Sequence, residues 1–272
     1  MVNAEIWLNA NIPNSQRANI RGLLICSESQ RNQLVLQDTM RGIHESTCNS
    51  YYLPYSRSLT GTLNLSSFVN LEKLIVENQF IQSINFTDCE KLKEIHCNNN
   101  LLRLVKFTQE AEDLEVIHLK NNNFWATDLS CFSRFTNLIT LNLGTDDIER
   151  IRKNVYNRWN GSLVHLWDLE KLMILDINST DISRGLEYLP TEGLVDFFFG
   201  NKGREGAGVD ELKRIFQNLA VLEEGETLED WATKEEWDED ENKLETIREW
   251  QSSQEFRNQI QQVQQQISLN RR

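Results

Sequence analysis

The sequence is short of the features that mark membrane and secreted proteins. No stretch approaches the roughly 18 consecutive apolar residues that a bilayer-spanning helix needs, so we expect no transmembrane segment. The opening residues, MVNAEIWLNANIPNSQRANI, contain no basic segment followed by an apolar run, so we expect no signal peptide. The five cysteines are odd in number and scattered, which favours reduced thiols. These absences predict a cytoplasmic protein.

Basic residues and catalytic motifs are also scarce. Lysine and arginine number 28 against 41 acidic residues, for a net charge of −13. Nucleic acids and anionic membranes attract basic surfaces, so we expect neither as a partner, and a basic protein suits this charge better. The sequence contains no Gly-x-Ser-x-Gly, His-Glu-x-x-His or kinase motif, and the glycine-rich run 200–208 lacks the Lys-Ser/Thr pair of a P-loop. We therefore expect no enzyme and no cofactor.

What the sequence does contain is a repeat. In residues 92–102, LKEIHCNNNLL, five positions that recur elsewhere lie at offsets 0, 3, 5, 8 and 10. Copies begin at residues 71, 92, 114, 138 and 172, and a sixth at residue 194 fades after its predicted strand. This spacing is the leucine-rich-repeat signature. One step is 34 residues long and carries an extra segment, IERIRKNVYNRWNGSL, which we expect to form an enlarged loop.

The repeat predicts an α/β fold, a leucine-rich-repeat solenoid. Each copy supplies one short strand, and the strands stack in parallel on the concave face, opposite a mostly irregular convex side. Alternate strand residues point inward, so Ile95 and Cys97 belong to a core that neighbouring copies complete. Asn100 and Asn122 leave the strand and are predicted to form a ladder of buried amide hydrogen bonds. The other copies hold weaker substitutes at this position: Gln79, Asp146 and Thr180.

The chain outside the array divides into predicted caps, an insertion and a tail. The predicted parts are an N-terminal cap and first repeat (1–29), an insertion (30–57), the array (58–204), a capping helix (205–222), an acidic linker (223–242) and a tail (243–272). The insertion is expected to be a loop or disordered. A partner-binding element rich in tyrosine (Tyr51, Tyr52, Tyr55) and a gene-model artefact are its alternatives.

Apolar spacing predicts helices at both ends of the chain. The N-terminal cap is expected to use Ile6, Trp7, Leu8, Ile12 and Ile20, followed by a strand with Leu23 and Ile25 inward. The C-terminal capping helix is expected to share one apolar face: Val209, Leu212, Ile215, Phe216 and Leu219. The tail has coiled-coil spacing for less than two heptads, so it is either a short self-associating helix or an exposed segment: Phe256, Ile260, Val263 and Ile267.

The adjacent His96 and Cys97 could suggest a metal site. Successive strand residues point to opposite faces, so these two side chains cannot hold one ion together, and we expect no metal. His118 holds the same position one repeat later, about 4.8 Å away across the sheet, so the two imidazoles could stack or share a ligand. A surface histidine pair is therefore the prediction.

The outward strand residues define a candidate partner-binding surface on the concave face. Exposed apolar side chains among mixed charges suit a protein partner better than a glycan, and a solvated face with no dedicated ligand is the alternative. The candidate residues are Lys73, Ile75, Glu94, His96, Val116, His118, Lys120, Asn142, Ile174, Asp176 and Phe198.

Several stretches together resemble a group of fungal leucine-rich-repeat proteins that is abundant in arbuscular mycorrhizal fungi. The stretches are NAEIWLNANIP, LTGTLNLSSFVNLEKL, FTNLITLNLGTDDIERI and GSLVHLWDLEKLMILDINSTDISRGLEYLP. The resemblance covers roughly residues 3–25 and 59–200, and it implies an intracellular binding module with a tail for association or signalling. In that group the array is often followed by a coiled coil or a kinase-like domain. This sequence departs from the pattern through the insertion after Ser29, the absence of kinase motifs and the shortness of its coiled-coil spacing.

These observations predict a protein-binding module, scaffold or adaptor that uses its concave face. The alternative is an assembly protein that oligomerises through its helical tail, with the array as a spacer.

Overall fold

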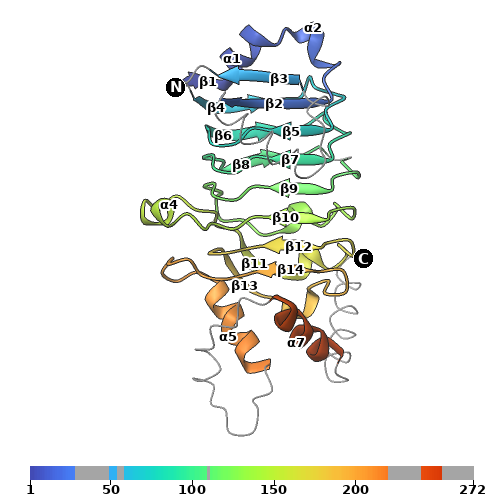
Figure 1. The fold of residues 1–272 in the computed structure, drawn as a ribbon, viewed down its shortest axis with the longest axis vertical. Coiled ribbons are helices and arrows are strands. Elements are labelled where there is room, and N and C mark those ends of the chain that lie inside the picture. Colours follow the sequence, from blue (N-terminus) through green and yellow to red (C-terminus); the bar gives the residue numbers. More distant parts are fainter. Residues whose placement is uncertain (28–48, 54–57, 109–110, 220–239, 253–272) are drawn as a thin grey trace, which may run out of the picture.

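The computed structural model describes residues 1–27, 49–53, 58–108, 111–219 and 240–252. It is an α/β structure whose longest dimension follows a stack of parallel strands (Figure 1). Helices occur mainly at the two ends of this stack. Within the described ranges, none of the helices has the length and apolar content needed to span a bilayer.

Eight strands form the main parallel sheet, in the order β14-β12-β10-β9-β7-β5-β2-β3. The strands are β2 (Gly22–Ser27), β3 (Asn49–Leu53), β5 (Lys73–Ile75), β7 (Glu94–His96), β9 (Val116–His118), β10 (Thr140–Asn142), β12 (Ile174–Asp176) and β14 (Asp196–Phe198). From β5 to β14, strands that follow one another at the repeat spacing are neighbours in the sheet. Their central residues pair in register and are fully buried: Leu74, Ile95, Ile117, Leu141, Leu175 and Phe197.

Two smaller parallel sheets lie on the other side of the core. The strands of the four-stranded sheet are β1 (Val2–Asn3), β4 (Leu59–Asn64), β6 (Phe80–Asn85) and β8 (Leu104–Lys106), and those of the two-stranded sheet are β11 (Asn160–Ser162) and β13 (Asp181–Arg184). The prediction of mostly irregular structure there was too coarse. In β6, Ile81 and Ile84 are buried while Gln82 is exposed, so the apolar residues of this half pack inward from a strand. One buried apolar cluster joins both sides.

The N-terminal end is covered by helix α1 (Ala4–Asn11) and the short helix α2 (Asn14–Arg17). The side chain of Asn3 caps α1 by accepting a hydrogen bond from the Ile6 amide at 3.1 Å. Of the apolar residues predicted for this cap, Ile6 is exposed, because it lies on the solvent side of α1. The remaining ones are buried: Trp7, Leu8, Ile12, Ile20, Leu23 and Ile25.

The predicted insertion contributes a strand. Residues 49–53 form β3, which pairs in parallel with β2 from Leu23↔Asn49 to Ser27↔Leu53. The expectation of a loop was therefore wrong for this stretch, which includes Tyr51 and Tyr52. Its physical basis is the open edge of β2, whose backbone groups need a partner on that side. Residues 30–48 and 54–57, including Tyr55, lie outside the described residues.

The extra segment of the long step is more structured than an enlarged loop. It contains helix α4 (Ile148–Arg152) and strand β11, and it leads into the 3₁₀ helix η3 (Leu163–Leu166). The Arg150 guanidinium of α4 donates to the Asn100 backbone oxygen at 2.8 Å, which ties the segment to an earlier repeat. The remaining 3₁₀ helices are η2 (Ser130–Phe132) and η4 (Leu186–Tyr188).

Helices α5 (Val209–Leu219) and α7 (Asp240–Ser252) lie at the C-terminal end of the array (Figure 1). Helix α5 buries Val209, Leu212 and Phe216, and α7 buries Leu244 and Ile247. The predicted boundary between linker and tail at residue 243 falls inside α7. Most of the acidic linker and the coiled-coil positions from Phe256 onward lie outside the described residues.

Candidate functional site

The outward residues of β5, β7, β9, β10, β12 and β14 form one continuous surface, which we call the strand face. The pairing register places them in two columns that each cross the six strands. The first column runs Lys73, Glu94, Val116, Thr140, Ile174 and Asp196. The second runs Ile75, His96, His118, Asn142, Asp176 and Phe198. All predicted candidate residues except Lys120 therefore lie in these two columns, and Lys120, two residues after the end of β9, contacts the second column through Asp176.

Two candidate residues are less available than the sequence suggested. Ile75 is only 6% exposed, and its neighbour in register on β2 is the buried Leu24. Asp176 is only 4% exposed, because it lies beneath the side chain of Lys120. The prediction that Ile75 and Asp176 are exposed contact residues was therefore wrong. The other candidates are partly or well exposed, and Phe198 is the most open of the apolar ones.

The two imidazoles on the strand face stack on each other. The ring centroids of His96 and His118 lie 4.9 Å apart, and their planes differ by 12°. His96 Nε2 lies 3.0 Å from Glu94 Oε2, and the Asn142 amide nitrogen lies 3.0 Å from His118 Nδ1. The Asn142 side chain therefore lies within hydrogen-bond distance of the His118 ring. The pair is thus oriented from both sides.

Glu94 is the anionic centre of this half of the strand face. Its carboxylate contacts His96 and forms an ion pair with Lys73 at 2.9 Å. The hydrogen bond with His96 lowers the pKa of Glu94 to about 2, against the opposing effect of burial and with further help from Lys73. Glu77, in contrast, has its pKa raised by burial, although His96 and Asn98 oppose the rise.

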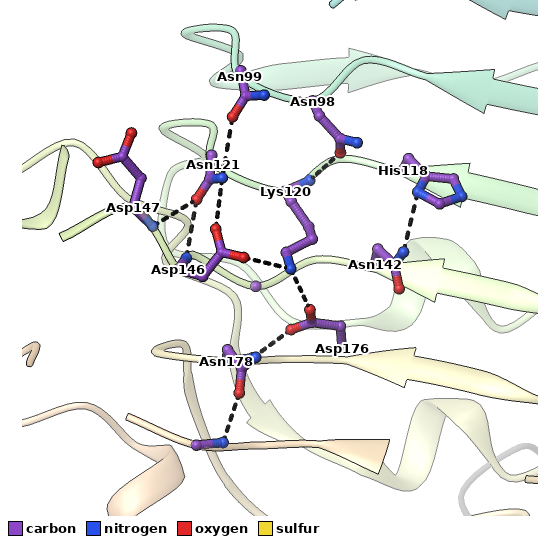
Figure 2. A network of polar contacts seen from close by, with 12 residues as sticks. Asn98, Asn99, His118, Lys120, Asn121, Asn142, Asp146, Asp147, Asp176 and Asn178 are labelled. Atoms are coloured by element: carbon purple, nitrogen blue, oxygen red, sulfur yellow. Dashed lines mark hydrogen bonds and ion pairs between the residues drawn. The ribbon is translucent and has the colours of Figure 1, made fainter. Parts of the chain in front are cut away.

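Lys120 is the centre of a second charged cluster. Its ammonium lies 2.7 Å from Asp146 Oδ2 and 2.8 Å from Asp176 Oδ2 (Figure 2). Burial alone would lower the pKa of Lys120, but the two carboxylates outweigh it and raise the pKa. Burial raises the pKa of Asp176, whereas the contacts with Lys120 and Asn121 hold that of Asp146 below its ordinary value despite partial burial.

The buried amide ladder is built as the spacing predicts at two of its positions. The Asn100 amide nitrogen donates to the Val76 oxygen at 2.8 Å, and its Oδ1 accepts from the Ile81 amide. Asn122 repeats the pattern one copy later, donating to the Cys97 oxygen at 3.0 Å and accepting from the Leu102 amide. Each asparagine therefore joins its own turn to the preceding one.

Asp146 is not part of this ladder. Its place is taken by Asn157, which comes from the extra segment and donates to the Leu143 and Leu119 oxygens at 2.7 and 2.9 Å. Asp146 instead accepts from the Asn121 side chain at 2.7 Å and pairs with Lys120. The expectation of a weak ladder residue here was wrong, because Asn157 lies outside the offsets of the repeat. Because Asn157 fills the ladder position, the Asp146 carboxylate is available to pair with Lys120 next to the strand face.

A column of left-handed residues precedes the ladder and was not foreseen. Asn78, Asn99, Asn121 and Ser179 occupy the same offset in four copies, with φ between 53° and 57°. Asparagine tolerates this conformation better than most residues. In Figure 2 the side chains of Asn99, Asn121 and Asp146 are linked in sequence beside Lys120. The recurring asparagine before the ladder position was the available sequence signal.

The described part of the chain contains no cluster of side chains that could serve as a metal site. No three His, Cys, Asp or Glu side chains come together there as metal ligands. Cys97 is fully buried, and burial raises the pKa of its thiol well above the ordinary value. Cys97 is therefore a core side chain, while His96 lies on the strand face.

Comparison with known proteins adds no further assignment. No family model matches the chain, and no curated protein matches it. The functional interpretation therefore depends on the geometry of the strand face.

Proposed function

We propose that the chain is an intracellular leucine-rich-repeat solenoid that binds a protein partner through the strand face as its concave surface. It acts as a binding module or scaffold in the cytoplasm, without catalytic chemistry, and is related to the fungal group that it resembles. The observation that carries this proposal is the continuous register of six strands. That register presents charges, imidazoles and apolar side chains on one surface, which is where solenoids usually bind.

The arrangement of charges supports a specific protein partner. Lys73, Glu94 and His96 form one fixed group, and Lys120 with its two aspartates forms another. Charges already held in place lose little conformational entropy on binding and favour partners with a complementary pattern. Val116 and Ile174, on the same surface, add partly exposed apolar area. The buried Ile75 and Asp176 support the surface from beneath.

The test compares two double variants of the full chain in proximity labelling followed by mass spectrometry. His96→Lys with Val116→Lys places two new cations at the centre of the strand face. The matched control, His165→Lys with Val69→Lys, makes the same changes at an imidazole beside Asp128 and at an exposed valine, both outside the strand face. We expect the first variant to lose a reproducible subset of labelled proteins and the control to keep it.

Folding of both variants is checked by urea unfolding and circular dichroism. Neither variant alters a fully buried side chain, so both are expected to fold. If the strand-face variant labelled the same proteins as the wild type, the assignment of binding to this surface would be wrong.

A further inference from the structure

The residues directly before the strands of the main sheet form a row along the N-terminal ends of these strands, and the row changes from charged to apolar toward the C-terminal end of the array. The residue at this position is charged in three earlier repeats and apolar in the last three, and we call the apolar part of the row the apolar edge. The charged residues are Glu72, Lys93 and Glu115, and the apolar ones are Ile139, Met173 and Val195. Met173 donates to the Ile139 oxygen and Val195 to the Met173 oxygen, each at 2.8 Å, so the three lie side by side. Met173 is 45% and Val195 53% exposed.

A cleft of about 910 Å³ adjoins this apolar edge. Its walls are the segments that lead into Met173 and Val195, together with the C-terminal part of α7. Trp167 lines the cleft and is 39% exposed. Its ring makes an edge-on contact with the ring of Tyr188, with 5.8 Å between the ring centroids. Three carboxylates also line the cleft: Glu170, Glu187 and Glu192.

Among the described residues that line the cleft, three carboxylates face one cation, Arg248, so the net charge of the lining is negative. None of the three glutamates forms an ion pair with another residue of the described part of the chain. Arg248, the cation of the cleft, directs its guanidinium to the Thr191 and Leu194 backbone oxygens at 2.9 to 3.0 Å. An incoming cation would therefore meet carboxylates that form no ion pair with the described residues, and the face of an exposed tryptophan attracts cations as well.

We propose that the apolar edge and the cleft form a second binding surface for a basic, amphipathic segment of another protein. The apolar side chains of that segment cover Met173 and Val195, and its lysine or arginine side chains enter the cleft between Trp167 and the glutamates. Charge complementarity selects this occupant, since the chain as a whole carries a net charge of −13. This surface goes beyond the strand face, because it uses neither Glu94 nor the Lys120 cluster.

The test measures fluorescence anisotropy of a fluorescein-labelled helical peptide of leucine and lysine, titrated with the full chain at low ionic strength. Glu170→Gln, Glu187→Gln and Glu192→Gln together are expected to weaken binding about tenfold, since three screened ion pairs are lost. The control triple variant, Asp88→Asn, Glu90→Gln and Glu112→Gln, removes the same charge from exposed sites elsewhere. It is expected to bind within about twofold of the wild type.

The apolar edge has a test of its own in the same assay. Met173→Ser with Val195→Ser is expected to weaken binding several-fold, whereas Val69→Ser at an exposed apolar site outside the surface has no such effect. Equal weakening by the two charge-removing triple variants would show unspecific attraction and overturn the proposal. So would an absence of peptide binding, or equally tight binding of a leucine–glutamate peptide. Loss of partners by the His96 and Val116 variant is measured in the separate labelling experiment, so the failure of one proposal can be told apart from the failure of the other.

Discussion

Asn157 is the residue whose role lies furthest from the repeat pattern. It is fully buried, and its amide holds carbonyl groups of two successive turns. We expect Asn157→Ala to lower the free energy of unfolding by about 2–4 kcal/mol, because the buried Leu143 oxygen loses its side-chain donor and the Phe124 amide loses its side-chain acceptor. Urea unfolding followed by circular dichroism measures the change.

Asn137→Ala provides the comparison for Asn157. Its amide also donates to a backbone oxygen, that of Glu112, but at an exposed position where water can replace it. The cost there is expected to stay below about 1 kcal/mol. Equal effects of the two substitutions would contradict the ladder role of Asn157.

Glu94 gives the strand face a pH dependence with a defined sign. Its pKa in the folded chain is about 2, below the value of about 4.3 expected when unfolded. The stabilisation is therefore complete above the unfolded pKa and is lost as the pH falls from about 5 toward 2. We expect the stability advantage of the wild type over Glu94→Gln, measured by urea unfolding, to shrink across that range. Glu90→Gln, at an exposed site, is the control; an advantage that persists unchanged at pH 2 would contradict this role.

Single residues were predictable where the repeat offset alone decides their environment. Asn100, Asn122 and Ile95 follow from the offsets, since each copy places them against an equivalent neighbour. Asp146 and Asp176 were not predictable in the same way. Their surroundings depend on the path of the extra segment and on a lysine reaching across two strands, neither of which the spacing encodes.

Helix α7 covers the end of the array through side-chain donors. Arg248 donates to the Thr191 and Leu194 oxygens, and Gln251 donates to the Leu186 and Leu189 oxygens. At this end no further strand follows β14 in the sheet of the described chain, and α7 covers this end instead. Its docking therefore depends on a few polar contacts in addition to Leu244 and Ile247.

Arg248→Ala tests this role of α7. Loss of hydrogen bonds from a charged donor is expected to weaken docking of the helix by about 1–3 kcal/mol. Hydrogen exchange of residues 240–252 should then accelerate, while that of the central strands β7 and β9 stays unchanged. Glu249→Ala, an exposed neighbour on the same helix, is the control. Unaltered exchange in α7 after Arg248→Ala would show that the apolar contacts alone hold it.

Elements were predictable where they recur and unpredictable where they occur once. The three-residue strands β7 and β9 follow from the repeat. Strand β3 has no equivalent in the other copies, and its existence depends on the open edge of β2, which only the assembled sheet reveals. The same holds for α4 and β11 in the long step.

At the scale of the whole molecule, the pairing of β2 with β5 differs from the other pairings of the array in the sequence distance that it spans. The strands from β5 to β14 pair with partners one step away in the sequence, whereas Leu23 pairs with Leu74 about 50 residues later. Closing that pair costs more chain entropy than pairing neighbours at the repeat spacing. The spacing predicted the order of the array from β5 onward, but the place of β2 required the folded chain.

The residue-for-residue register from β5 to β9 also has a consequence for how such a gene changes. The copies from Leu71 to Leu92 and from Leu92 to Leu114 are 21 and 22 residues long, and their central strand residues, Leu74, Ile95 and Ile117, are in register and equally buried. Loss or duplication of one whole copy by unequal recombination would keep every remaining strand in register. The length of the strand face is therefore a trait that inheritance can alter in single steps, each adding or removing one pair of outward side chains.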